Sequence, residues 1–473
     1  MIELTTLSIY LIILLWIGLR SSRKIHSSTD YTLAGRDISW MIILATTSAT
    51  MIGGGASVGT ISRVYEIGIG AVVVTCAWHL QLIFSGIWVA PRLRSLNLIT
   101  VADYFELRFG PLAHGLAVVN CLFFLVGALV AQMVAMATIA SSIMDIPYGS
   151  ALLIGATVTI FYSTVGGIRA VVATDVLQFL ILVIGIGIAS ALLLIKNDGF
   201  FEMSQQIGLE HFNITGHWSA THFISLFVAF FLGEMFIPPY TVRFLIARDP
   251  RQAKLGISGS GIFLLLFLPI TTFIIGLSAI VDPAVQLAAQ GGVQQVFPAL
   301  VRATFHPVFA GIMIAAMMAA AMSSADSVLS CHATVIMEDI YRKYFNPQGK
   351  DRLLLRVAQW TTLITGIAAA IFAYYFRDII QVLEFVYDYW APGMVLPFLV
   401  GLFWYHPKRI YAVVISMCAG SASTTIWLWL GSPWDVGAAL LGFSIAVTGF
   451  FVALPFTSKR RLGNLFQPRK SSG

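Results

Sequence analysis

Residues 312–341 form an apolar stretch of small side chains that is interrupted by several oxygen-bearing residues, and its centre reads AAAMSSADSVLS. At 100° per residue, Ser323, Asp326, Ser327 and Ser330 fall within an arc of roughly 100° on one face of a helix. A carboxylate and several hydroxyls inside a hydrophobic span are costly unless they face a polar cavity, a partner or an ion. The stripe therefore predicts a binding site. The alternative is that its serines bond back to their own helix and allow close helix packing.

The composition of the whole chain indicates the environment in which this stripe lies. Of 473 residues, 58% are hydrophobic and 11% are charged, whereas soluble proteins have about 25% charged residues. The apolar segments have the length of about 20 residues that a membrane helix needs, and they lack the alternation of barrel strands. The sequence therefore predicts an all-α integral membrane protein embedded in a lipid bilayer.

About thirteen transmembrane helices are expected from the apolar segments. They lie at roughly 4–20, 38–62, 69–90, 112–143, 148–164, 171–195, 221–242, 255–281, 306–331, 353–375, 380–403, 410–430 and 436–456. With the N-terminus outside, nearly all Lys and Arg fall on the inner side, Arg243, Arg248 and Arg251 among them, as the positive-inside rule predicts. We therefore expect a multi-pass protein of the plasma (inner) membrane with a cytoplasmic C-terminus.

Charge and motif content exclude several other classes of protein. The net charge is +6, but the basic residues lie at span ends rather than in a patch, so no nucleic-acid partner is expected. The four cysteines have no CxxC spacing, which speaks against a disulfide framework or a zinc site. No HExxH pattern is present, and GASVG at 55–59 lies within an expected membrane span rather than at the strand-to-helix turn of a GxSxG elbow, so the chain is not expected to be an enzyme.

Two of the expected spans are broken by their own residues. The second contains Gly53, Gly54 and Gly55, and the seventh contains Pro238 and Pro239. Irregular backbone at membrane depth is tolerated where it lines a cavity or is buried in protein. Paired breaks at matching positions of two inverted halves are typical of a transport site, and five spans follow from each break. The alternative is two unrelated packing kinks. The expected division is 1–37 (extra helix and loop), 38–195 and 196–403 (five-helix repeats) and 404–473 (two helices and a basic tail).

Several motifs resemble those of one family. They are DYTLAGRDISW followed by SATMIGGGASVGT, GGIRAVVATDVLQ at 166–178, AAAMSSADSVLS with MEDIY behind it, and WAPGMVLPFLVGLFW at 390–404. The chain resembles the sodium/solute symporter family, whose members carry sugars, proline, pantothenate, sialic acid or choline with sodium. The resemblance covers essentially the whole chain. It implies a leucine-transporter-like 5+5 inverted repeat, Na+ as the coupling ion and a small-molecule solute as the other partner.

The resemblance also implies positions for the ions. The primary sodium site is expected to use Leu44, Thr47, Ala320, Ser323 and Ser324. Carbonyls and neutral hydroxyls suit a hard monovalent cation that must also be released.

A possible second sodium or proton is expected at Asp175, Asp326 and Ser327. Asp326 departs from the serine of two-sodium members, and it could be an anionic ligand, a proton acceptor or the partner of an arginine. The alternative for Asp175 is a structural pair with Arg169 or with an inner-loop base.

The solute is expected between the two broken spans. The candidate residues are Met51, Gly54, Thr75, Trp78, His79, Glu234 and Glu384. Aromatic and apolar side chains with a carboxylate would suit a small organic cation or zwitterion; the alternative is that the apolar ones are ordinary core or lipid-facing residues. We therefore expect a sodium-coupled symporter that imports a small organic solute by alternating access. A proton-coupled transporter, or a transporter-like sensor with a separate signalling partner, is the alternative.

Overall fold

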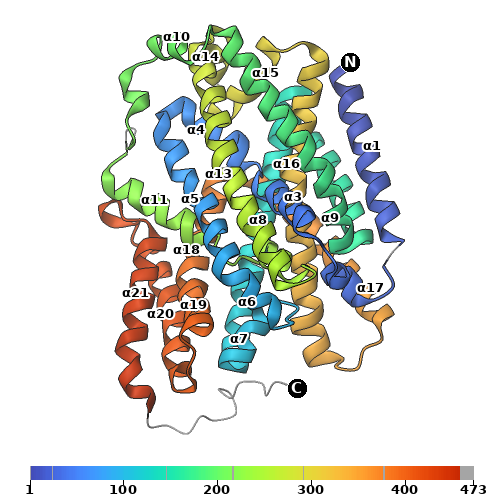
Figure 1. Cartoon of the computed structure of the whole chain (residues 1–473), viewed down its shortest axis with the longest axis vertical. Coiled ribbons are helices and arrows are strands. Elements are labelled where there is room, and N and C mark those ends of the chain that lie inside the picture. Colours follow the sequence, from blue (N-terminus) through green and yellow to red (C-terminus); the bar gives the residue numbers. More distant parts are fainter. Residues whose placement is uncertain are drawn as a thin grey trace.

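The structure is a computed structural model, and it describes residues 2–23, 25–144, 146–215, 218–290, 292–376 and 379–458. The described part is built from helices, most of which run along the long axis of the molecule (Figure 1). An isolated β-bridge joins Ile38 and Ala247. The expected basic tail falls largely on residues 459–473, which lie outside the described residues.

The helices divide conveniently at residue 200. Before it lie α1 Ile2–Ser22, α2 Ser28–Leu33, η1 Ala34–Arg36, α3 Trp40–Met51, η2 Gly55–Gly59, α4 Thr60–Ile67, α5 Ile69–Phe84, η3 Ser85–Val89, α6 Ala90–Ser95, α7 Val101–Phe109, α8 Pro111–Met144 and α9 Tyr148–Lys196. From it onward lie α10 Phe200–Gln205, η4 Leu209–Phe212, α11 Ala220–Gly233, α12 Pro238–Leu245, α13 Pro250–Val281, α14 Pro283–Ala289, η5 Val293–Gln295, α15 Val296–Thr304, α16 Pro307–Thr334, η6 Val335–Phe345, α17 Asp351–Tyr375, α18 Ile379–Trp390, η7 Ala391–Val395, α19 Leu396–Phe403, η8 Pro407–Arg409, α20 Ile410–Trp429, η9 Pro433–Asp435, α21 Ala438–Ala453 and η10 Leu454–Ser458.

Eleven helices of the described part are long and apolar enough to cross a membrane, or up to twelve if a bent pair counts as one span. One of them, α9, has 49 residues and as a straight rod would be about 74 Å long, more than twice the apolar thickness of a bilayer. It turns at Gly167 (φ 49°, ψ −157°), between the expected spans 148–164 and 171–195. The count of thirteen, the 5+5 repeat and the domain boundaries stay predictions.

Helix α16, which carries the polar stripe, lies at the centre of the bundle. In its apolar stretch 83% of the residues are buried, against 22% in α1 at one edge of the molecule. It packs against α8, α9 and α1, while α20 and α21 form the opposite edge (Figure 1). The small residues of α16 allow this close packing, because alanine side chains let helix backbones approach each other. The polar stripe is therefore enclosed by protein rather than by lipid.

The first broken span consists of α3 and the segment Gly55–Ile67, which are bent by 62° relative to each other. The Gly54 amide donates to Oε1 of Gln132 on α8 at 3.2 Å. A Cβ added at Gly53 would lie 2.6 Å from Oγ of Ser324, and one added at Gly54 would lie 2.5 Å from Cβ of Ala135. Glycine is therefore required here so that α8 and α16 can approach the backbone.

The second broken span consists of α11 and α12. Four residues, 234–237, separate the helices, and Phe236 among them has a φ of 63°. Pro238 and Pro239 occupy the first turn of α12, where proline needs no backbone donor. The freed carbonyl of Met235 accepts a hydrogen bond from Nε1 of Trp390 on α18 at 2.8 Å. At each break, therefore, a neighbouring helix supplies a hydrogen-bond partner to a backbone group.

Candidate functional site

The hydroxyls of Ser323 and Ser324, in the middle of α16, point to the end of α3. Ser323 Oγ donates to the carbonyl of Ala49 at 2.8 Å, and Ser324 Oγ donates to the carbonyl of Thr50 at 2.7 Å. The two hydroxyls also lie 3.0 and 3.3 Å from the carbonyl oxygen of Ala320. Three carbonyls and two hydroxyls thus meet in a buried place. We call these five oxygens the carbonyl–hydroxyl cluster, and their chemistry suits a hard monovalent cation.

Of the residues expected at the primary sodium site, α16 brings Ala320, Ser323 and Ser324 into this cluster. Leu44 is half-buried and lies against α13. Thr47 is buried, and its hydroxyl has no hydrogen-bond partner in the described part of the chain. The carbonyls that accept from the α16 hydroxyls lie nearer to the end of α3, because only the last turn of a helix has carbonyls without an intrahelical partner.

Beside this cluster, Arg243 of α12 is completely buried, with an exposed fraction of 0%. This corrects the prediction that Arg243 is one of the inner-loop bases that orient the chain. It follows the second break closely, in the apolar run FIPPYTVRFLIA. A lone arginine in such a run indicates a buried ionic partner, because an isolated buried guanidinium is too costly to retain.

The guanidinium of Arg243 uses all three of its nitrogen atoms. Its acceptors are the Asp175 carboxylate (2.9 Å), the hydroxyls of Ser327 (2.7 Å), Thr50 (2.5 Å) and Thr46 (3.2 Å), and the carbonyl of Pro239 (2.6 Å). The hydroxyl of Thr46 also donates to the carboxylate of Asp175. These acceptors come from α3, α9, α12 and α16. The ion pair therefore ties both broken spans to the two central helices.

Asp175 was expected either to bind an ion or to pair with Arg169 or an inner-loop base. The structure pairs it with Arg243, and both side chains are 0% exposed. Arg169 instead lies 3.6 Å from Asp30, near the surface. The pairing alternative for Asp175 therefore holds, with a partner from the second broken span.

Asp326 is also completely buried, on the face of α16 that meets α9. Tyr162 of α9 donates to its Oδ2 at 2.8 Å, and the hydroxyl of Ser327 lies 3.3 Å from its Oδ1. Ser327 in turn donates to the carbonyl of Ser323 at 2.7 Å. The structure therefore brings Asp175, Asp326 and Ser327 together around one position, as expected, and a guanidinium lies in contact with two of them.

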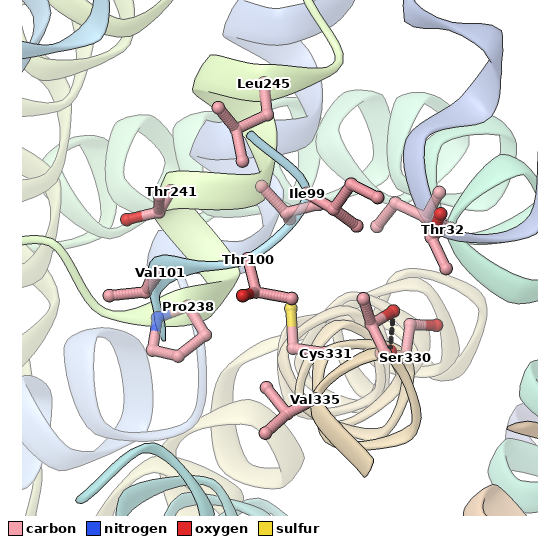
Figure 2. A pocket seen from close by; sticks show the side chains of 13 residues that line it. Thr32, Ile99, Thr100, Val101, Pro238, Thr241, Leu245, Ser330, Cys331 and Val335 are labelled. Atoms are coloured by element: carbon pink, nitrogen blue, oxygen red, sulfur yellow. Dashed lines mark hydrogen bonds between the residues drawn. The ribbon is translucent and has the colours of Figure 1, made fainter. Parts of the chain in front are cut away.

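A small cavity of about 20 Å³ lies one to two helical turns further along α16 (Figure 2). Ser330, Cys331 and Thr334 of α16 line it, with Thr100 and Thr241 among the residues opposite. Its volume is enough for about one water molecule. The Ser330 hydroxyl is buried and has no partner in the described part of the chain. The polar stripe thus continues beyond the ion pair toward a small, mostly apolar cavity that also has threonine and serine residues in its lining.

A larger cavity of about 210 Å³ lies between α4, α5, α11 and α18. Thr75, Trp78 and Glu384, three of the expected solute residues, line it. Trp78 stacks on Phe230 with ring centroids 4.5 Å apart and an interplanar angle of 19°. The Trp78 Nε1–H is buried and has no acceptor among the described residues.

Glu234 and Met51 lie together at the two breaks. Tyr387 of α18 donates to Oε1 of Glu234 at 2.5 Å, and Tyr240 of α12 donates to Oε2 at 2.7 Å. The Tyr240 hydroxyl also lies 2.6 Å from Sδ of Met51. Phe230, one turn before Glu234, packs edge-on against Tyr387. The aromatic pair of the larger cavity is therefore directly connected to this buried carboxylate.

The remaining expected solute residues lie outside the lining of that cavity. Gly54 contacts α8 through its amide. His79 is buried and its backbone carbonyl lies at Gly261 of α13. All seven expected solute residues stay predictions as solute contacts.

The sequence of the chain also matches a known protein family. The model of the family described as "Sodium:solute symporter family" matches residues 31–418, which is most of the chain. The chain belongs to the sodium:solute symporter family. The family consists of transporters rather than enzymes, so the protein is a multi-pass membrane transporter by family.

Curated relatives of this family member share about a quarter of its residues. The sodium/glucose cotransporter of Vibrio parahaemolyticus is 27% identical over 442 residues, which cover 85% of this chain and 81% of that protein. The high-affinity proline transporter PutP of Bacillus subtilis (strain 168) is 26% identical over 466 residues, which cover 93% and 95%. The family is thus established, whereas the solutes differ among relatives.

Solved structures agree on the fold. A Na+-coupled sialic acid symporter in a substrate-bound, outward-open state matches with a TM-score of 0.85 and 19% identity, covering 98% of this chain and 99% of that one. A nucleobase-cation-symport-1 family transporter in a closed conformation matches with a TM-score of 0.57 and 12% identity, covering 93% and 96%. At these identities the likeness shows the fold alone.

Several site residues of this symporter-family chain were missed from its sequence. They are Arg243, Tyr240, Tyr387, Tyr162, Thr46, Thr50 and Ala49. The position of Arg243 in an apolar run could have indicated it, and so could the four-residue spacing of Thr46 and Thr50, which places both hydroxyls on one face of α3. The tyrosines carried no local signal, because tyrosine is common in apolar spans.

Proposed function

We propose that this chain is a sodium-coupled secondary active symporter that imports a small organic solute by alternating access. The observation that carries the proposal is the contact of the α16 hydroxyls with the freed carbonyls of α3. A sodium ion in the carbonyl–hydroxyl cluster would be bound by two helices at once. It would therefore favour the state in which α3 and α16 lie close together.

The solute is proposed to enter the cavity lined by Thr75, Trp78 and Glu384. This cavity and the carbonyl–hydroxyl cluster share the first broken span, because Gly55 of η2 lines the cavity and Ala49 of α3 belongs to the cluster. Sodium and solute can therefore raise each other's affinity through the same backbone, and such a coupling free energy is reciprocal. We further propose a location in the plasma membrane with the N-terminus outside, on the basis of the distribution of Lys and Arg.

Thermal unfolding of the purified chain tests sodium binding without knowledge of the solute. Sodium at 100 times its Kd should stabilise the folded chain by about 2.7 kcal/mol, because it binds the native state. Replacing both Ser323 and Ser324 by alanine should abolish this shift, whereas Ser330→Ala, on the same stripe but outside the cluster, should keep it. An unchanged sodium shift in the double variant would contradict the proposed sodium site.

A solute screen then tests the transport function itself. Glucose, proline and choline, which represent a neutral sugar, a zwitterion and an organic cation, are added with and without sodium. A solute that shifts the melting temperature more in sodium is carried forward to uptake in proteoliposomes. Uptake driven equally well by a pH gradient in sodium-free buffer would overturn sodium coupling in favour of proton coupling.

A further inference from the structure

Arg243 occupies the place at which the sequence suggests a second cation. Two of the three residues expected there, Asp175 and Ser327, contact its Nη2 at 2.9 and 2.7 Å. Asp175 supplies Oδ2 to it, the same atom that accepts from Thr46. Asp175 Oδ2 and Ser327 Oγ are therefore already hydrogen-bonded to a positive charge, while Asp175 Oδ1 is buried without a hydrogen-bond partner in the described part of the chain.

The residues around Arg243 provide hydrogen-bond acceptors for all three nitrogen atoms of its guanidinium. It makes five polar contacts from three nitrogen atoms, and each acceptor is a buried group of α3, α9, α12 or α16. Arginine retains its proton in proteins, so its charge is permanent. A bidentate or forked guanidinium also holds its partners more rigidly than a mobile ion does.

Charge repulsion argues against a further ion beside Arg243. A sodium ion within contact distance of Asp175 Oδ2 or Ser327 Oγ would lie close to the guanidinium, and like charges repel strongly where water is excluded. The carbonyl–hydroxyl cluster is different, because its oxygens come from Ala49, Thr50, Ala320, Ser323 and Ser324, and the five hydrogen bonds of Arg243 involve none of these oxygen atoms.

We propose that the guanidinium of Arg243 is a resident cation that takes the place of a second sodium, so that the chain binds and carries a single sodium ion. This inference rests on the proposed function and adds the ion stoichiometry to it. Arg243 then has two tasks. It neutralises Asp175 in every state of the cycle, and it reserves sodium binding for the carbonyl–hydroxyl cluster.

Equilibrium binding of radioactive 22Na+ to the purified full-length chain tests the inference without a solute. The wild-type chain should bind about one sodium ion with a Hill coefficient of about 1, because a single site cannot show cooperativity with itself. Binding of about two ions by the wild-type chain would overturn the inference and leave the sodium-coupled function intact. Absence of any sodium binding would instead overturn the proposed function.

Variants of the ion pair sharpen the test. Arg243→Gln removes the charge and keeps hydrogen-bonding groups, so a second sodium should bind beside Asp175 and the ratio should rise from about one toward two. Arg243→Lys keeps a cation and should stay at one. The double variant Arg243→Gln with Asp175→Asn removes the anion as well and should return to one.

Folded Arg243→Gln protein that still binds one sodium would contradict the idea that Arg243 occupies a latent ion site. Folding is checked by size-exclusion chromatography before each binding measurement. If Arg243→Gln does not fold, the wild-type stoichiometry still decides between one and two ions.

Discussion

The two broken spans place different chemical groups at their breaks. At the first break, neutral hydroxyls of Ser323 and Ser324 satisfy the carbonyls that α3 leaves free. At the second break, the carboxylate of Glu234 accepts hydrogen bonds from Tyr240 and Tyr387. A cation can insert between hydroxyls and carbonyls, because all of these oxygens have lone pairs to offer it. Glu234 can release its tyrosines only if another donor or a cation replaces them.

Under the proposed function, this difference separates an ion-binding break from a solute-facing break. The first break contributes backbone oxygen, which is the same for any side chain, whereas the second contributes side chains that can vary between relatives. Arg243 joins the two, since it belongs to α12 after the second break and contacts Thr46 and Thr50 before the first. Variants at each break should therefore affect different measurements.

The largest effect is expected from separating the ion pair that joins the breaks. Asp175→Ala leaves the guanidinium of Arg243 buried without its anion, and loss of one partner from a buried pair costs about 3–5 kcal/mol. The apparent melting temperature of the purified protein measures this loss. A variant in which Arg243→Gln accompanies Asp175→Asn should recover most of it, and failure to recover would show that the pair does not act as a unit.

A smaller loss is expected at the second break. Tyr387→Phe removes one of the two donors to Glu234 and leaves a buried oxygen of the carboxylate without that bond, which costs about 1–3 kcal/mol. The stabilisation by sodium should persist in this variant, because the carbonyl–hydroxyl cluster is untouched. Loss of the sodium response in Tyr387→Phe would mean that the two breaks are not separable.

The first break should be sensitive to a single added methyl group. In Gly53→Ala the new Cβ would lie 2.6 Å from Ser324 Oγ, so the hydroxyl must move away from the Thr50 carbonyl. We expect sodium affinity to fall at least about tenfold, which corresponds to about 1.4 kcal/mol. Gly115→Ala on α8 is the matched control, because no atom lies within 4 Å of its added Cβ. Equal sodium affinity in the two variants would contradict the role given to Gly53.

The sequence could predict what depends on short-range pattern. The polar stripe of α16 is a periodicity within one helix, and the two breaks are marked by glycine and proline residues themselves. The stripe itself indicated Ser323 and Ser324, and the family resemblance implied Ala320, which the structure brings beside them, and Thr75, Trp78 and Glu384, which line a common cavity.

What could not be predicted depends on how separate helices meet. The end of α3 had to be known before its free carbonyls at Ala49 and Thr50 could be assigned, and Leu44 and Thr47 stay predictions as ion ligands. Arg243 lies 68 residues from Asp175 in sequence, so no local sequence pattern can predict which aspartate it pairs with. Its charge was therefore attributed to a loop, although its apolar neighbours already argued for burial.

The smallest expected effect concerns the aromatic pair beside the second break. Phe230→Leu removes the stacking of Phe230 on Trp78 while keeping an apolar side chain, and such pairs contribute about 0.5–1.5 kcal/mol beyond their buried area. Sodium-induced stabilisation in the absence of solute should stay unchanged, while the affinity for a solute found in the screen should fall by less than about tenfold. If the stabilisation by sodium fell together with the solute affinity, Phe230 in the cavity would also affect sodium binding. The two breaks would then not act independently of each other.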